Sequence, residues 1–179
     1  MGQMVHNNTT QSDKKLLTKL SDFSKNMTQH HHLENLSEFV LHDVCSIDQF
    51  QVPKAAYLVN NPDFICLKGV AGYHTPESFK KGDVWMNQKA FTSHMKNANF
   101  NQKVRSVQDK SLLLDGQRMD DRKIYGLADQ LEINNPMYHV WTMKHDNQGV
   151  LIFQKPEDFD IGQEHFLRFL YMLSFCPVF

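Results

Sequence analysis

The sequence predicts a single α+β domain, and three observations support this fold class. Apolar residues recur at helical spacing near both ends of the chain. Between these ends lie two pairs of β-rich segments joined by turn residues. The chain has 179 residues, 41% hydrophobic and 22% charged, which suits one folded domain of ordinary size. We therefore expect a flexible N-terminal tail over residues 1–12 and one domain over residues 13–179.

The first predicted helix begins near Ser12 or Asp13, because both residue types are good N-caps. Four apolar residues then follow at intervals of four, three and four, and form one narrow stripe: Leu16, Leu20, Phe23 and Met27. A narrow stripe is typical of a coiled-coil seam, which would make it a dimer interface. The same stripe would equally serve to pack the helix onto the domain's own sheet. Both interpretations stay open at the level of the sequence.

A second helix is predicted after the histidines at positions 30–32. Apolar residues between Leu33 and Val44 fall near helical spacing, and we expect Glu34 and Glu38 to point outward. Three consecutive histidines point in different directions, so we interpret them as a polar joint between two helices rather than as a metal site. Pro53 prevents the helix from continuing and precedes a strand.

Two β-hairpins are predicted. The first joins residues 54–61 to residues 64–73 through an Asn-Asn-Pro-Asp turn. The second lies within residues 137–155, with a turn at 146–149 in which Gly149 is expected to supply a positive φ. Bulky residues alternate on both faces of its first strand, which predicts a central, two-sided position in the sheet.

The middle of the chain, residues 74–135, has weaker patterns. We expect a short helix over residues 90–97, short strands over 104–107 and 111–114, and a charged, exposed loop over 115–123. A last helix is predicted to begin near Asp160. Its apolar side carries four residues at helical spacing: Phe166, Phe169, Leu170 and Leu173.

The order and content of these elements resemble the GAF domain family. The resemblance rests on LENLSEFVLHDV, on KAAYLVNNPDFICLKGVAGY and on MYHVWTMKHDNQGVLIFQKPEDFDIGQEHFLRFLYML, which together make up 69 of the 179 residues. Gly69 and Gly72 stand where GAF domains often carry a glycine that ends the second strand. Gly149 stands before the apolar run VLIF, as a glycine does in the closing hairpin of that family.

The resemblance implies a GAF/PAS-like central antiparallel sheet of about six strands, flanked by helices that include the N- and C-terminal ones. It also implies a pocket between the sheet and the middle segment, and a homodimer formed through the terminal helices. Such domains usually regulate an attached or associated output domain. We therefore expect a cytoplasmic, signal-sensing regulatory domain of a bacterial-type signalling protein that binds a small molecule and is not itself an enzyme.

Aromatic residues in or beside the middle segment are the candidate ligand-binding residues, because small-molecule pockets are lined mainly by apolar and aromatic groups. The candidates are Trp85, Phe91, Tyr125, Tyr138 and Trp141, together with His139. The alternative is that these residues form the core beneath the middle loops. Arg105, Arg118 and Arg122 are candidates for binding an anionic ligand. The sequence indicates no particular cofactor.

Other function classes lack support in the sequence. A net charge of −1 gives no basic surplus for nucleic acid, and no apolar run is long enough to span a bilayer. The three dispersed cysteines suggest buried free thiols in a reducing compartment. GVAGY lacks phosphate-loop spacing and is interpreted as a strand bend. We predict no catalytic or metal-binding residue, and keep as alternatives a ligand-free dimerisation or protein-interaction module and a small thiol-dependent reductase.

Overall fold

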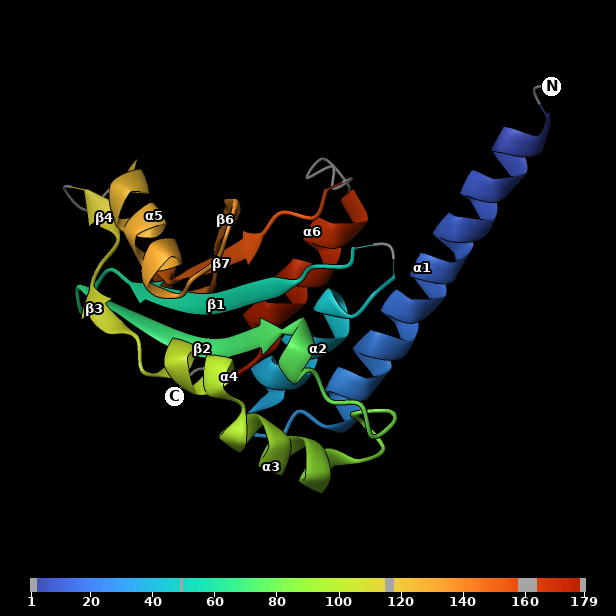
Figure 1. Cartoon of the computed structure of the whole chain (residues 1–179), viewed down its shortest axis with the longest axis horizontal. Helices are drawn as coiled ribbons and strands as arrows, with labels where there is room; N and C mark the ends of the chain where they lie inside the picture. Colours follow the sequence, from blue (N-terminus) through green and yellow to red (C-terminus); the bar gives the residue numbers. More distant parts are fainter. Residues whose placement is uncertain (1–2, 49, 115–117, 158–163, 178–179) are drawn as a thin grey trace.

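The computed structural model describes residues 3–48, 50–114, 118–157 and 164–177, with side chains described from residue 14 onward except at residues 114, 118 and 164. The fold is α+β, as predicted, and is built on a five-stranded antiparallel sheet with the strand order β3-β2-β1-β7-β6 (Figure 1). The bounds of these strands are β1 Lys54–Asn61, β2 Cys66–His74, β3 Gln108–Lys110, β6 Pro136–Thr142 and β7 Gln148–Gln154. The resemblance implied about six strands, whereas the described sheet has five. A separate two-stranded ladder joins β4 (Leu113–Leu114) to β5 (Arg118–Met119).

Helices cover both faces of the sheet (Figure 1). Alternate residues of β1 point to opposite faces, so Ala55 and Tyr57 join one core while Ala56 and Leu58 join the other. The first core is covered by α1 (Gln3–Gln29), α2 (Leu36–Cys45), α3 (Gln88–Asn97) and α6 (Glu164–Tyr171). The second is covered by α4 (Asn99–Arg105) and α5 (Asp121–Gln130). This second core is filled by apolar side chains from the sheet and from the middle segment.

Helix α1 begins at Gln3, which corrects the expected start near Ser12 or Asp13. Its N-terminal part extends away from the rest of the molecule (Figure 1). Further along, Leu16, Phe23 and Met27 are buried in the chain's own core, and Leu20 packs against the same core. The predicted stripe is therefore used within one chain, which is the second of its two interpretations. It is not exposed as a seam for a second copy.

The two terminal helices meet inside a single chain. The ring of Phe23 on α1 contacts that of Phe169 on α6 edge-on, with centroids 5.6 Å apart. Helix α2 packs against both the sheet and α6, and every residue of α2 except Asp43 is buried. Glu38 is therefore buried rather than pointing outward as expected. The histidines at 30–32 lie in the turn between α1 and α2, as the predicted joint requires.

The GVAGY segment contains a β-bulge in β2, in agreement with the predicted strand bend. Tyr57 pairs with Ala71 and the next residue of β1 pairs with Gly69, which leaves Val70 as the extra residue. Gly69 is required for a second reason. A Cβ at this position would collide with the backbone carbonyl oxygen of Val104, so only glycine lets α4 pack this closely on β2.

Both predicted hairpins form, but two details of the second hairpin are corrected. Strand β6 lies at the edge of the sheet, and β7 rather than β6 lies inside it. The turn residues with positive φ are His145 and Asp146. Gly149 instead lies within β7, opposite Trp141, where a Cβ would collide with the indole ring.

The middle segment is more helical than the sequence suggested. The predicted helix over residues 90–97 is present as α3, but residues 104–107 end α4 and its following turn and do not form a strand. The expected exposed loop over 115–123 is replaced, in its described part, by β5 and the start of α5. Asp120 is the N-cap of α5, and its side chain accepts a hydrogen bond from the backbone N–H of Arg122. Residues 115–117, and the predicted helix start at Asp160, lie outside the described residues.

Two short 3-10 helices, η1 Thr75–Glu77 and η3 Met172–Phe175, and the tight turn η2 Lys144–Asp146 complete the described chain. Within the described residues, no helix combines the length and the apolar character that crossing a bilayer would require.

Candidate functional site

The structure distributes the six predicted ligand-binding residues over three separate places. Trp85 and Phe91 pack against Phe39 of α2. Tyr125 and Tyr138 meet on the α5 face of the sheet, with ring centroids 6.2 Å apart. The remaining two residues lie on the opposite face of β6. These residues therefore do not line one common pocket, and the alternative of a core role fits Trp85, Phe91 and Trp141 best, since all three are buried.

Trp85 contacts both α1 and α2 near the turn that joins them. Its indole N–H donates a 2.5 Å hydrogen bond to Asp43, and its ring stacks on His30 and contacts Phe23 edge-on. The same region forms a cleft of about 250 Å³ between α1, α2 and α6, lined in part by Trp85 and Asp43. Burial raises the pKa of Asp43 to about 6, although the hydrogen bond from Trp85 partly offsets this effect.

His139 and Trp141 lie between β6 and the C-terminal helical segment. The indole N–H of Trp141 donates to the hydroxyl of Ser174 at 2.8 Å, and its ring stacks on Tyr57. The Nε2 atom of His139 is buried and has no hydrogen-bond partner among the described residues. Burial also lowers the pKa of His139, so the neutral imidazole is favoured here.

A larger cleft, of about 400 Å³, opens at the β2 edge of the sheet. Strand β3 pairs with residues 66–68 of β2 only, so the following part of β2 has no neighbouring strand on that side. Helix α4 and its following turn cover this part instead. The N–H of Gly69 donates to the carbonyl of Val107 at 2.9 Å, and that of Gly72 donates to the Asn101 side chain at 2.8 Å. The cleft lies between this edge, α2 and α3.

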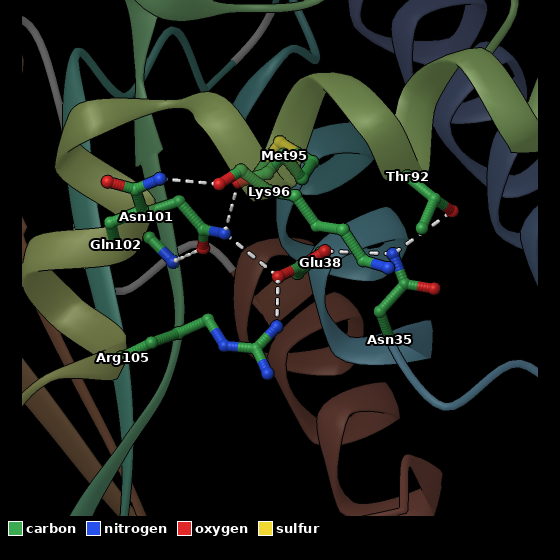
Figure 2. Close-up of polar contacts among 9 residues, drawn as sticks. Asn35, Glu38, Thr92, Met95, Lys96, Asn101, Gln102 and Arg105 are labelled. Carbon is green, nitrogen blue, oxygen red and sulfur yellow. Dashed lines mark hydrogen bonds and ion pairs between the residues drawn. The ribbon is translucent and has the colours of Figure 1, made fainter.

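The inner wall of the cleft is a buried polar network centred on Glu38, which is 2% exposed. Its carboxylate accepts hydrogen bonds from Asn35 at 2.8 Å, from Asn101 at 2.8 Å and from Arg105 at 2.7 Å (Figure 2). Asn101 also donates to the carbonyl of Met95 at 2.9 Å. The network thus ties α2, α3, α4 and β2 together. Because Glu38 is held by three donors, it acts as a fixed acceptor that orients Arg105.

The cleft is rich in basic side chains. Lys68 comes from β2, Lys96 from α3 and Arg105 from α4, and the acidic residues of the lining are Glu34 and the paired Glu38. Arg105 is 53% exposed, so donors of its guanidinium fork remain open to the cleft. An arrangement of this kind can bind a small anion through carboxylate or phosphate oxygens. The full lining is Glu34, Asn35, Ser37, Glu38, Lys68, Gly69, Val70, Thr92, Lys96, Arg105 and Pro177.

Of the three arginines named from the sequence, only Arg105 lines this cleft. Arg118 lies on β5 and Arg122 on α5, in a different part of the fold. Sequence reasoning missed Lys68 and Lys96, which have no local signal beyond their charge. It also misplaced Glu38, although the apolar run Phe39, Val40 and Leu41 directly after it was a possible signal of a buried carboxylate.

The cysteines lie on separate elements and are free thiols. Burial raises the pKa of Cys45, and it raises that of Cys176 to about 12 despite a neighbouring Ser37 hydroxyl that lowers it. A thiol of this kind is rarely a thiolate, which is the nucleophilic form. The described residues also contain no group of three or more His, Cys, Asp or Glu side chains that could hold a metal ion.

The chain is therefore an α+β domain with a basic cleft at one edge of its sheet. Comparisons with protein-family models, with curated proteins and with solved structures find no match to this chain. The functional argument therefore rests on the residues of the cleft.

Proposed function

We propose that this chain is a GAF-like regulatory domain that senses a small anionic molecule bound in the cleft between α2, β2 and the α3–α4 segment. The observation that carries the proposal is that Lys68, Lys96 and Arg105, from three different elements, line this one cleft. The ligand class is a small molecule with carboxylate or phosphate groups, because these match the geometry of a guanidinium fork. A volume of about 400 Å³ suits a molecule of metabolite size.

The architecture supports the regulatory part of the proposal. Two hairpins meet through β1 and β7, helices cover both faces of the sheet, and the terminal helices pack together. A domain of this type passes its signal to an attached or associated output domain of a bacterial-type signalling protein. We place it in the cytoplasm, where its three free cysteines would stay reduced.

Helix α2 provides a route from the cleft to the terminal helices. Glu38 faces the cleft, while the adjacent Phe39 contacts Trp85, which in turn contacts Phe23 of α1. At the other end of the chain, Pro177 follows η3 and lines the cleft itself. A ligand that binds one packing arrangement of α2 more tightly than another would shift the population of the α1–α6 contact.

We assign no catalytic step to the cleft, so the proposed function is binding rather than catalysis. Its one buried acid, Glu38, is engaged by three hydrogen-bond donors from the chain itself, which favours a structural role for this side chain. The buried thiols favour their protonated form. These observations weigh against the thiol-dependent reductase.

The proposal is tested by calorimetric titration of the purified chain with inorganic pyrophosphate and with citrate. Both probes should bind, and binding should weaken as salt is added. Replacing Lys96→Ala should weaken binding about tenfold, which corresponds to about 1.4 kcal/mol. The matched control is Lys89→Ala, which changes another exposed lysine of the same helix that does not line the cleft, and this variant should bind like the original chain.

Two results would contradict the proposal. One is the absence of binding of either probe at millimolar concentration. The other is an equal loss of affinity in both lysine variants, which would indicate a diffuse effect of net charge instead of a site. Either result would shift the interpretation to the ligand-free interaction module.

A further inference from the structure

The two edges of the sheet differ in how they are protected. Strand β3 is three residues long, carries Asp109 and Lys110 and is exposed along its length. Short, charged edge strands are a common protection against pairing with another chain. Strand β6 is seven residues long, has the sequence PMYHVWT and carries no Asp, Glu, Lys or Arg. Only Pro136, at the first position of β6, lacks the backbone N–H that pairing with another strand would use.

The register of β6 shows which backbone groups are free. Met143 donates to Asn147 at 2.7 Å and Lys155 donates to Asn135 at 3.2 Å, so the odd-numbered residues of β6 face β7. The N–H and C=O groups of Tyr138, Val140 and Thr142 therefore point to the outer edge. No hydrogen bond from another part of the described chain reaches these groups.

Exposed aromatic residues flank this edge on both faces of the sheet. On one face Tyr125 of α5 is 47% exposed and contacts Tyr138. On the other face Tyr171 contacts His139, and Phe175 is 70% exposed and follows Ser174, which bonds to Trp141 of β6. Three of the seven large hydrophobic side chains exposed in the described chain thus gather around β6. A gathering of this kind, rich in tyrosine, is typical of a protein interface.

We propose that a second copy of this chain pairs with β6 in antiparallel orientation, so that one continuous sheet crosses the dimer. The strand is complementary to itself. A two-fold axis at Val140 places Tyr138 of one copy opposite Thr142 of the other, so all three outward-facing residues form ladder pairs. In this register Lys144 lies opposite Pro136, and like charges do not oppose each other. The exposed aromatic residues then cover the junction on both faces.

This interface differs from the one that the apolar stripe of α1 suggested. Leu16, Phe23 and Met27 are already buried within one chain. It is also independent of the proposed anion site, because β6 and β2 lie on opposite sides of the central pair β1 and β7. Loss of one property should leave the other unchanged.

The mass of the full chain in solution, measured by sedimentation equilibrium over a range of concentrations, tests the proposal. We expect a dimer of the 20.9 kDa chain. Val140→Pro removes an N–H that points outward and spares the bonds to β7, and Phe175→Asp places a charge at the junction. Each substitution should raise the dissociation constant at least tenfold. The control Met86→Asp changes a side chain that is 84% exposed on another surface, and it should leave the dissociation constant unchanged.

Hydrogen exchange provides a second readout that does not depend on Val140→Pro folding normally. The amides of Tyr138, Val140 and Thr142 should exchange at least tenfold more slowly in the original chain than in the Phe175→Asp variant at the same concentration. A chain that stays monomeric at all concentrations would overturn the proposal. So would a dimer in which these three amides exchange rapidly, since its interface would then lie elsewhere.

Discussion

Two adjacent residues of α2, His42 and Asp43, depend on pH in opposite senses. His42 lies edge-on to Tyr73 and Phe91, and burial together with the nearby His94 lowers its pKa to about 4 from 6.5. Because the fold favours the neutral imidazole, stability from His42 is fully present above pH 6.5 and is lost as the pH falls towards 4. Asp43, with a pKa raised from 3.8 to about 6, stabilises the fold less as the pH rises through this interval.

The substitution Asp43→Asn should separate the pH dependence of stability caused by Asp43 from that caused by His42. The amide can still accept the hydrogen bond from Trp85 but carries no charge, so the cost of an ionised buried carboxylate disappears. We expect the variant to be more stable than the original chain by on the order of 2 kcal/mol at neutral pH, and equally stable at a pH below about 4. Urea unfolding as a function of pH measures the difference. A variant with the same pH dependence as the original chain would show that Asp43 is not the group responsible.

Single residues of the cleft were only partly predictable from the sequence. Arg105 was a candidate for anion binding because of its side-chain chemistry alone. Glu38 was expected to point outward, since a carboxylate is seldom fully buried without a partner. The partners Asn101 and Arg105 lie more than sixty residues further along the chain, and only the folded structure brings them to Glu38.

Among the secondary-structure elements, the contact between α4 and β2 depends on the absence of a side chain at Gly69. Replacing Gly69→Ala forces the new Cβ against the Val104 carbonyl, and the two elements must separate. We expect a loss of about 3 kcal/mol, comparable to an overpacked core. Gly126 lies within α5 with no atom close to where a Cβ would sit, so Gly126→Ala should stabilise the chain by about 0.5–1 kcal/mol.

Thermal and urea unfolding of both alanine variants provide the measurement. The two substitutions are chemically identical, so opposite signs would isolate the effect of close packing from the effect of glycine on the unfolded chain. If Gly69→Ala were as stable as the original chain, α4 would not lie against β2 as described.

Element boundaries were least predictable in the middle of the chain. Helix α5 was missed because charged residues precede it and Gly126 interrupts it, although Ile124, Leu127 and Leu131 follow helical spacing. Strand β6 was predicted to be central because both its faces carry bulky residues. At this edge of the sheet α5 covers one face and the C-terminal helical segment covers the other. Bulky side chains on both faces of β6 therefore indicate that helices cover both faces, and they do not require a neighbouring strand on each side.

At the scale of the whole molecule, variants of α1 distinguish a helix that belongs to the core of one chain from a helix that forms a dimer interface. Phe23 is 4% exposed and contacts both Trp85 and Phe169, so Phe23→Ala should destabilise the chain by about 3 kcal/mol. Leu17, which is 48% exposed on the same helix, provides the control, and Leu17→Ala should change stability by less than about 0.5 kcal/mol.

Urea unfolding of these variants should be combined with their masses in solution. If α1 belongs to the core of each chain, the Phe23 variant loses stability while its dimer dissociation constant stays the same. A Phe23 variant that is fully stable but no longer dimerises would instead restore the interpretation of the stripe as a seam.

The sequence by itself determined the fold class, the two hairpins and the existence of helices at both ends, because these depend on local periodicity and turn chemistry. It also marked the stripe of α1 as a buried surface without indicating what buries it. The tertiary structure showed that the chain's own core buries this stripe and which strand lies at each edge of the sheet. It also showed that Lys68, Lys96 and Arg105 line the same cleft as Glu38. These features depend on contacts between residues far apart in the chain, which no local pattern specifies.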